Sequence, residues 1–350
     1  MVQIKNPLVV MGDSGSTPEP LDPEEVYADT RPSDWMEMPT TVNDNEIYFL
    51  LQIPDEMTDA VRFTLPGIPI VSGGTLTYEF GTVSSGVFTA DATLTVTGSG
   101  STTSFAIPNA SFVDVTDDNQ RQLMMKISCD TNITQFLIAS SSYQTSSAFQ
   151  QLFVEVKGVL EHITSVYNMF GHASPDYGSK RVRYISLYAP AVSNYGFFAM
   201  YCLNLICVLD LDTSSGTNFS YMFQGCYSLT AADFTGYDFS AVTSATALNQ
   251  MLGGVWACTI TFGDTFGNNG IINTATIVSS NRANTYSRTH IKITKDDAML
   301  AIAANATTLF QGTYTYVYVP DALLSTYQAD TYWATLGSRL KAMSDYPYTS

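Results

Sequence analysis

The sequence is poor in charge, and most of the charge it has is acidic. Only 13% of its 350 residues are Asp, Glu, Lys or Arg, and 32 acidic against 15 basic residues give a formal net charge of -17. No run of basic residues relieves this negative field, which repels phosphates and anionic lipid headgroups. We therefore expect the chain to bind no nucleic acid and to make no membrane insertion.

Long hydrophobic runs are also missing. The longest apolar stretch, residues 196–209, contains Asn204 and is shorter than the roughly 20 residues that a membrane-spanning helix needs. Near the N-terminus a short apolar run is broken by Asn6 and Pro7, so we expect no secretory signal there.

Cysteine and histidine are too few, and too scattered, to indicate a disulfide framework or a metal site. The cysteine count is odd and no C-x-x-C pair occurs, so we expect buried, reduced thiols. Each histidine lies apart from cysteine or acidic neighbours that could complete a ligand set. We expect no metal and no cofactor. The residues concerned are Cys129, Cys202, Cys207, Cys226, Cys258, His162, His172 and His290.

Thr, Ser, Tyr, Phe and Gly are abundant instead, and this composition favours a mainly β fold. We predict three parts: an extended N-terminal arm and linker (1–45), a β-sandwich (46–158) and a repeat domain (159–350). Residues 11–45 are rich in Pro, Asp, Glu and Ser, which predicts a linker that cannot fold alone. The apolar peptide before it is a candidate virion anchor, formed by Ile4, Asn6, Pro7, Leu8, Val9 and Val10.

Between residues 46 and 158 the apolar residues recur with a period of two. The run Ile47, Phe49, Leu51 and Ile53 is the first of seven or eight such segments, which are separated by clusters of Gly, Pro, Asn and Ser. Each strand then has one apolar face that a second sheet must cover. This pattern predicts an antiparallel β-sandwich.

After residue 158 the period changes. Leu160, Ile163, Tyr167 and Phe170 fall at helical spacing, which predicts an amphipathic helix that caps the start of the next domain.

A degenerate repeat follows. Apolar anchors at Met169, Phe198, Met222 and Met251 are 29, 24 and 29 residues apart, which suits the repeat of a leucine-rich-type solenoid, about 20 to 29 residues long. Residues at equivalent positions of such a solenoid stack into a ladder, with Cys as a small apolar filler. The predicted ladder residues are Phe198, Cys202, Leu205, Met222, Cys226 and Leu229.

The C-terminal segment has the features of a solenoid cap. Residues 316–319 predict a strand and Pro320-Asp321 the start of a helix. An open solenoid end needs an apolar cover of this kind, which we assign to Leu323, Leu324, Tyr327, Trp333, Leu336, Leu340 and Met343.

Three segments carry a resemblance to a known family. YMFQGCYSLTAADFTG, with its partner FFAMYCLNLICVLDL, resembles the BspA-like leucine-rich repeats of bacterial surface proteins and gut-phage structural proteins. The ending YVYVPDALLSTYQADTYWATLGSRLKAMSDYP and the lead-in RPSDWMEMP are similar to the closing and opening segments of the phage versions. The resemblance covers about half of the chain and implies a virion adhesin or tail appendage. The sequence departs from the family in having few regular repeats, with Asp210 and Ala232 where the ladder is usually more apolar.

Motifs that could carry catalysis are weak. Gly12-Asp13-Ser14-Gly15 resembles the serine-protease tetrad but lies in the linker, with no preceding domain to supply His and Asp. Asp210 and Asp212 lack the glycine and terminal glutamate of an EF-hand loop. The acidic pairs 117–118 and 296–297 are typical of solvated turns more than of a glycosidase cleft. We predict no catalytic residues and no enzyme activity.

Aromatic residues beside the repeat turns are the better candidates for binding, because aromatic rings stack on sugars and anchor protein contacts. The sequence leaves open which of them lie in the core. The candidate receptor contacts are Tyr195, Tyr201, Tyr221, Tyr227, Tyr237 and Trp256.

The leading functional hypothesis is a bacteriophage virion protein, assembled in the host cytoplasm, that binds a host-surface protein or glycan without catalysis. Its arm would contact other virion proteins, and family analogy implies a homo-oligomer, a trimer. A capsid decoration or head fibre protein would use the same parts. A bacterial surface adhesin and a polysaccharide depolymerase are further alternatives.

Overall fold

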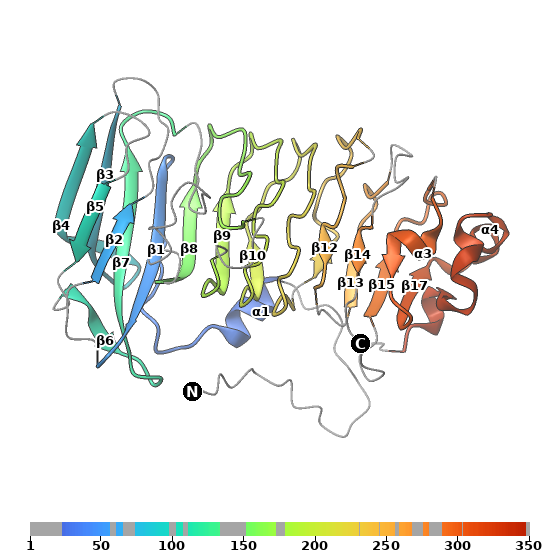
Figure 1. Ribbon diagram of the computed structural model, residues 1–350, viewed down its shortest axis with the longest axis horizontal. Helices are drawn as coiled ribbons and strands as arrows, with labels where there is room; N and C mark the ends of the chain where they lie inside the picture. Colours follow the sequence, from blue (N-terminus) through green and yellow to red (C-terminus); the bar gives the residue numbers. More distant parts are fainter. Residues whose placement is uncertain are drawn as a thin grey trace.

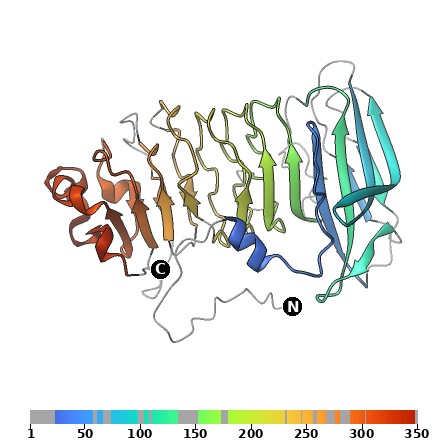
Figure 2. The same ribbon diagram turned by 180° about the vertical axis from the view of Figure 1, so that it is seen from behind.

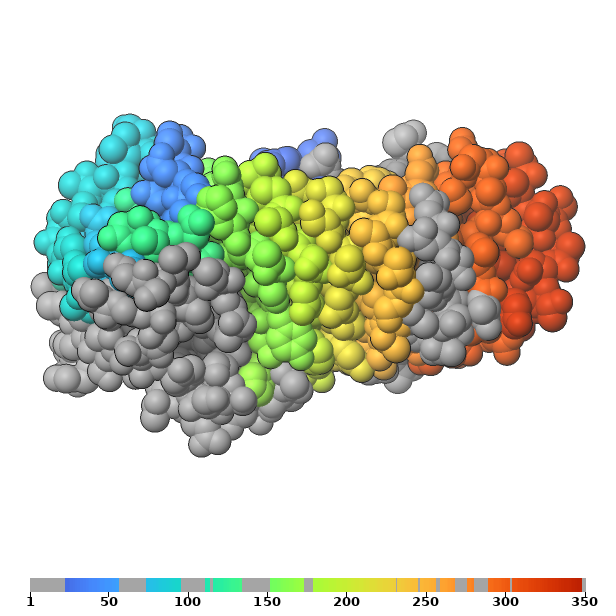
Figure 3. All heavy atoms as spheres, turned by 90° about the horizontal axis from the view of Figure 1, so that it is seen from above, coloured from blue at the N-terminus to red at the C-terminus, as the bar shows by residue number. Residues whose placement is uncertain are grey.

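A computed structural model describes residues 23–56, 61–65, 74–97, 103–107, 111–133, 152–172, 179–230, 232–244, 246–255, 259–267, 276–279, 289–302 and 304–347. The strands stand side by side in one long row that runs from the N-terminal to the C-terminal half (Figure 1). Seen from above, the molecule is elongated along this row (Figure 3). The prediction of a mainly β fold with a solenoid is confirmed; the solenoid has about five turns, and the described residues form few helices.

One sheet joins the N-terminal half to the first solenoid coils. Its eight strands follow the order β10-β9-β8-β1-β7-β3-β4, and β6 pairs with β7. The pairs among β1, β3, β4, β6, β7 and β8 are antiparallel, whereas β8, β9 and β10 are parallel because each begins a coil. The strands are β1 (Glu46–Pro54), β3 (Thr75–Ser84), β4 (Val87–Thr97), β6 (Val113–Val115), β7 (Gln120–Cys129), β8 (Phe153–Val159), β9 (Tyr184–Tyr188) and β10 (Cys207–Leu209).

The sheet therefore continues across the domain boundary predicted at residue 158, and both parts share one hydrophobic core. A separate antiparallel pair is formed by β2 (Val61–Leu65) and β5 (Thr103–Ile107). The division of the chain into domains stays a prediction.

The solenoid continues with two parallel sheets. One has the order β11-β13-β15-β17-β18 and the other β12-β14-β16. Short helices close the C-terminal end. The strands are β11 (Asp233–Phe234), β12 (Leu252–Gly253), β13 (Thr259–Phe262), β14 (Val278–Ser279), β15 (Thr289–Ile293), β16 (Phe310–Gln311), β17 (Thr315–Val319) and β18 (Leu340–Ala342); the helices are α3 (Ala306–Leu309), α4 (Leu324–Ala329) and the 3₁₀ segments η2 (Asp321–Leu323), η3 (Trp333–Arg339) and η4 (Met343–Asp345).

Hydrogen bonds between coils place the predicted anchors in register. The amide of the residue after each anchor donates to the carbonyl of the next anchor, at 2.9 Å in all three steps from Met169 through Phe198 and Met222 to Met251. All four anchor side chains are fully buried. The spacings of 29, 24 and 29 residues predicted from the sequence are those of the coils.

Residues 160–170 form the first of these coils, and the predicted capping helix is wrong. The segment has turns and an isolated bridge from Ser165 to Asn194 but no helix. Leu160, Ile163 and Phe170 are buried, while Tyr167 is exposed. A coil turns its apolar residues inward at intervals of three and four, so over this short stretch its pattern matches that of a helix.

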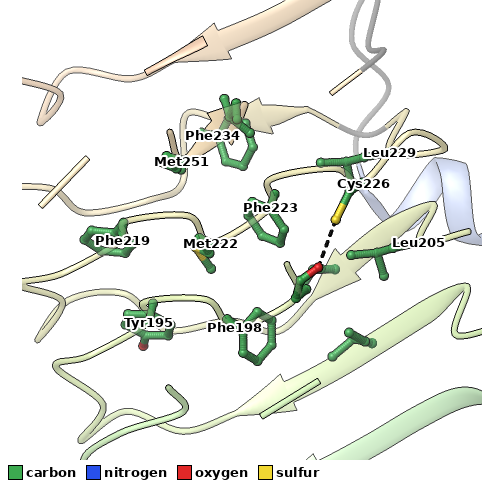
Figure 4. Packing of buried hydrophobic residues seen from close by; sticks show 14 of the residues in the cluster. Tyr195, Phe198, Leu205, Phe219, Met222, Phe223, Cys226, Leu229, Phe234 and Met251 are labelled. Carbon is green, nitrogen blue, oxygen red and sulfur yellow. Dashed lines mark hydrogen bonds between the residues drawn. The ribbon is translucent and has the colours of Figure 1, made fainter. Parts of the chain in front are cut away.

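The six predicted ladder residues are all buried in one core cluster. Figure 4 shows Phe198, Met222 and their neighbours stacked between successive coils. The cysteines do more than fill space: the thiol of Cys226 donates to the carbonyl of Ala199 at 3.1 Å, and that of Cys202 to the carbonyl of Phe170 at 3.6 Å. Burial raises the pKa of both thiols, so they stay protonated and able to donate.

Each coil also repeats a left-handed backbone residue directly before its anchor. Asn168, Phe197, Tyr221 and Gln250 have φ between 53° and 59°, a conformation that costs a non-glycine residue on the order of 1 kcal/mol. The amides of Phe197 and Tyr221 donate to the next coil at 2.9 and 2.8 Å. Inter-coil hydrogen bonds thus offset the local strain.

The N-terminal segment predicted as an independent linker is ordered in its described part. Residues 23–42, here called the strap, begin with helix α1 (Pro23–Thr30), which packs on β10 (Figures 1 and 2). Val26, Trp35 and Met36 are buried against the outer face of the sheet. The strap also covers Tyr48 and Leu50, so β1 is buried on both faces. The alternating apolar pattern in the sequence predicted only the face that points into the inner core.

A buried ion pair fixes the strap. Nε of Arg31 lies 2.9 Å from Glu155 of β8, whose side chain is 3% exposed, and the hydroxyl of Tyr27 donates to the same carboxylate at 2.6 Å. The Arg31 guanidinium also lies 5.9 Å from the ring of Trp35. Burial raises the pKa of Glu155, and its two partners oppose that shift.

The C-terminal cap closes the other end. Tyr327 and Trp333 are fully buried, and both bind Leu300: its amide donates to the Tyr327 hydroxyl at 2.9 Å, and Nε1 of Trp333 donates to its carbonyl at 2.9 Å. Leu336 and Leu340 are buried, whereas Leu323, Leu324 and Met343 are partly exposed. The predicted closing strand is β17.

Replacing Gly225 by Ala tests the repeated turn. Gly225 has φ 73°, and a Cβ atom there would lie 2.4 Å from Cδ1 of Tyr201. We expect the free energy of unfolding to fall by about 1–3 kcal/mol. Gly236→Ala is the matched control, because Gly236 is exposed and a Cβ there meets nothing within 4 Å. Equal urea midpoints for the two variants would contradict the proposed strain.

Replacing Arg31 by Met tests the strap. It leaves Glu155 buried without its cation, which costs about 3–5 kcal/mol. In Arg31→Met/Glu155→Gln the charge is gone, yet Tyr27 keeps an acceptor, so the loss in unfolding free energy should be smaller. A double variant less stable than the single one, measured by urea denaturation, would disprove the role of the ion pair.

Candidate functional site

Two of the predicted receptor contacts belong to the core. Tyr195 is fully buried, its hydroxyl donates to the carbonyl of Asp212, and its ring stacks on Phe219 at 5.2 Å. Burial and the nearby Asp212 raise its pKa. Tyr237 is half-buried, with its ring 4.9 Å from that of Phe234. The assignment of Tyr195 to a receptor surface is therefore wrong, because no ligand reaches its ring, and Tyr237 mainly supports the core.

Trp256 and the six anchor candidates, Ile4, Asn6, Pro7, Leu8, Val9 and Val10, lie outside the described residues. Both assignments stay predictions.

The other three tyrosines lie on the outside of the solenoid turns, together with two aromatic residues that were not among the predicted receptor contacts. Rings from three successive coils form a row: Tyr167 lies 5.1 Å from Phe197, and Phe197 lies 4.8 Å from Tyr221. Tyr167 is 37% exposed, and the other two are partly exposed. The signal for Tyr167 and Phe197 is their place one or two residues before an anchor, which appears only once the repeats are aligned.

Two further tyrosines, Tyr201 and Tyr227, lie three and five residues after an anchor. The ring of Tyr201 lies over Gly225, where even a Cβ atom would collide with it. Tyr227 is 40% exposed and lies near Gly254, whose Cβ would be 3.6 Å from Cε1 of its ring. Glycine on the next coil thus makes room for the ring of Tyr201, whereas the ring of Tyr227 is in ordinary contact distance of a Cβ atom. We call Tyr167, Phe197, Tyr201, Tyr221 and Tyr227 the aromatic face.

Side-chain amides link the coils that carry the aromatic face, and one of them binds a tyrosine of that face. Asn218 donates to Asn194 at 2.8 Å, Gln224 donates to Gln250 at 2.7 Å, and Nδ2 of Asn249 donates to the hydroxyl of Tyr221 at 2.8 Å. The face therefore combines apolar ring surfaces with fixed amide and hydroxyl groups. This combination suits sugars and polypeptides, which present apolar patches between hydrogen-bonding groups.

The candidate polar motifs are engaged in local contacts. Asp210 accepts from the hydroxyl of Ser186, and Asp212 from the amide of Ser214. In the acidic pairs, Asp118 accepts from Thr116, and Asp297 pairs with Lys295 at 2.6 Å. The tetrad at residues 12–15 lies outside the described residues.

The three histidines lie apart from one another. His162 is exposed and lies 3.1 Å from Asp44, whereas His172 and His290 are buried, the latter 2.9 Å from the hydroxyl of Tyr318. Within the described ranges no three His, Cys, Asp or Glu side chains gather as metal ligands. The helices seen in these same ranges are too short or too polar to cross a membrane.

Comparison with known proteins gives no match: no family model, no curated protein and no solved structure is similar enough to place the chain in a family.

Proposed function

We propose that this chain is a bacteriophage virion structural protein, a tail appendage or adhesin, which binds the host surface without catalysis. The observation that carries the proposal is the aromatic face, where rings from successive coils present a partly exposed surface set among amide groups. A globular protein that only needed a folded core would gain little from keeping these rings at the surface. The resemblance of three segments to gut-phage structural proteins supports the assignment to a virion.

Different parts of the chain have different roles in this proposal. The solenoid is of the BspA-like leucine-rich-repeat type in this proposal, and the pair β2–β5 contributes to the facing layer of a β-sandwich. The strap follows the N-terminal residues in the chain, and in this proposal those residues contact other virion proteins. Copies on one particle, arranged as trimers by family analogy, multiply weak contacts, because linked sites gain avidity without new contacts.

Localisation on particles tests the assignment to a virion. We expect an antibody against residues 160–347 to label the tail tip of intact particles in immunogold electron microscopy. Labelling over the capsid instead would replace the adhesin by a decoration or head fibre protein. Absence of label from all particles, with label on bacterial cells, would overturn the proposal in favour of a bacterial surface adhesin.

Competition for host cells tests the aromatic face. The purified chain should block adsorption of the particles, and Tyr167→Ser/Tyr221→Ser/Tyr227→Ser should block at least tenfold less well. Tyr332→Ser is the matched control, since Tyr332 is 40% exposed but lies in the C-terminal cap. Circular dichroism melting checks that all variants are folded. Equal competition by the triple variant and the parent would show that the aromatic face does not bind the host.

A further inference from the structure

The parallel sheet at the C-terminal end brings together cations that are far apart in the sequence. In the register of β15, β17 and β18, Lys292 lies opposite Tyr318, and Tyr318 lies opposite Lys341. Register partners in parallel strands point to the same face. Val317, Val319 and Leu340 are buried in the core on the other face, so these three side chains form one line on the outer face of the sheet. The ring of Tyr346 packs on this line, 5.2 Å from the ring of Tyr318 and 4.8 Å from Nζ of Lys292, and leaves Tyr318 only 3% exposed.

A second line lies beside the first. His290 is the register partner of Tyr316, and Arg339 lines the same groove as Tyr316. The groove is shallow, with a volume of about 580 Å³, and its lining includes Thr313, Tyr314, Leu336 and Ser338. We call Lys292, Tyr316, Arg339 and Lys341 the basic strip.

The guanidinium group of Arg339 is held by one hydrogen bond and has further N–H groups that can bind a ligand. Its Nη1 donates to the carbonyl of Gly312 at 2.6 Å, which uses one of five N–H groups. Neither Arg339 nor Lys341 forms an ion pair with a carboxylate in the described part of the chain. Arg339 lines the groove, and Lys341 follows two residues later in β18. In a chain with a net charge of -17, two such cations without acidic partners are unexpected, because carboxylates are the more abundant group.

The lining points to one class of ligand. A guanidinium fork binds a carboxylate through two parallel hydrogen bonds, and tyrosine rings such as those of Tyr314 and Tyr316 stack on the apolar faces of sugar rings. Thr313 and Ser338 add hydroxyl groups. We propose that the basic strip binds an acidic polysaccharide, whose uronic acid carboxylates contact Arg339 and Lys341 while its pyranose rings pack on Tyr314 and Tyr316.

Nucleic acid fits the strip less well. Specific or non-specific binding to DNA typically neutralises six to ten phosphates, and the strip offers three cations within a strongly acidic chain. The inference deepens the proposed function, because it names a class of host glycan, but it uses a surface on the C-terminal sheet, whereas the aromatic face lies on solenoid turns.

The test uses the full chain and two matched ligands. By isothermal titration calorimetry, tetragalacturonate should bind at least tenfold more tightly than its methyl ester, which has the same rings without charge. Arg339→Gln and Lys341→Gln should each weaken binding of the acid at least fivefold and leave binding of the ester unchanged. Lys295→Gln is the control, because Lys295 already pairs with Asp297.

Two outcomes would overturn the inference: equal affinity for acid and ester, or binding of a single-stranded DNA oligomer as tight as that of tetragalacturonate. Arg339 also donates to the carbonyl of Gly312, so weaker binding by Arg339→Gln together with a lower melting temperature would point to a displaced loop. In that case the affinity of Lys341→Gln for tetragalacturonate decides whether the inference holds, because Lys341 makes no such bond. The triple tyrosine variant of the aromatic face should bind tetragalacturonate like the parent. Failure of the strip therefore leaves the adsorption test of the proposed function unaffected.

Discussion

The architecture depends on the hydrogen bonds that each coil makes to the next. A single coil has too few residues to satisfy its own backbone groups or to bury its own apolar side chains, so it is stable only between neighbours. The left-handed residue before each anchor shows how strongly this constraint acts. Tyr221 and Phe197 adopt a conformation that their side chains disfavour, and the amides that this turn directs outward bind the adjacent coil. The stacked anchors and the cysteine thiols follow the same register.

The same constraint explains the two ends. A coil without a neighbour leaves both an open core and unpaired strand edges. At the N-terminal end β8 continues into an antiparallel sheet, so the solenoid begins as an extension of that sheet. At the C-terminal end Trp333 and Tyr327 cover the core and bind the backbone of Leu300. The strap adds a third closure, because it covers the outer face where the antiparallel and parallel parts of the sheet join.

Features that depend on local pattern can be predicted from the sequence. Alternation marks the strands, and the recurrence of Met169, Phe198, Met222 and Met251 is enough to indicate the register of the coils. Prediction fails where a segment packs on residues that are distant in the sequence. The apolar residues of the strap stand among Pro, Asp and Glu, and no neighbouring residue indicates that β1 and β8 lie beneath them. The spacing in residues 160–170 indicates a helix wrongly, because a tight coil and a helix share the same spacing of apolar residues. Tyr195 and Tyr227 look alike in sequence, and only the three-dimensional coil separates the buried ring from the exposed one.

Surface properties of a solenoid are generated by the same repetition as its core. An outward position in one coil lies about 5 Å from its equivalent in the next coil, so residues separated by one repeat length in sequence become neighbours. Tyr167, Phe197 and Tyr221 become a row in this way. In the C-terminal sheet the segments His290-Ile-Lys292, Tyr316-Val-Tyr318 and Arg339-Leu-Lys341 do the same. A chain without any basic run can therefore present a basic surface. In a repeat protein the local surface charge depends on residues from several adjacent coils. The net charge of -17 describes the whole chain and does not show the charge of a single strip.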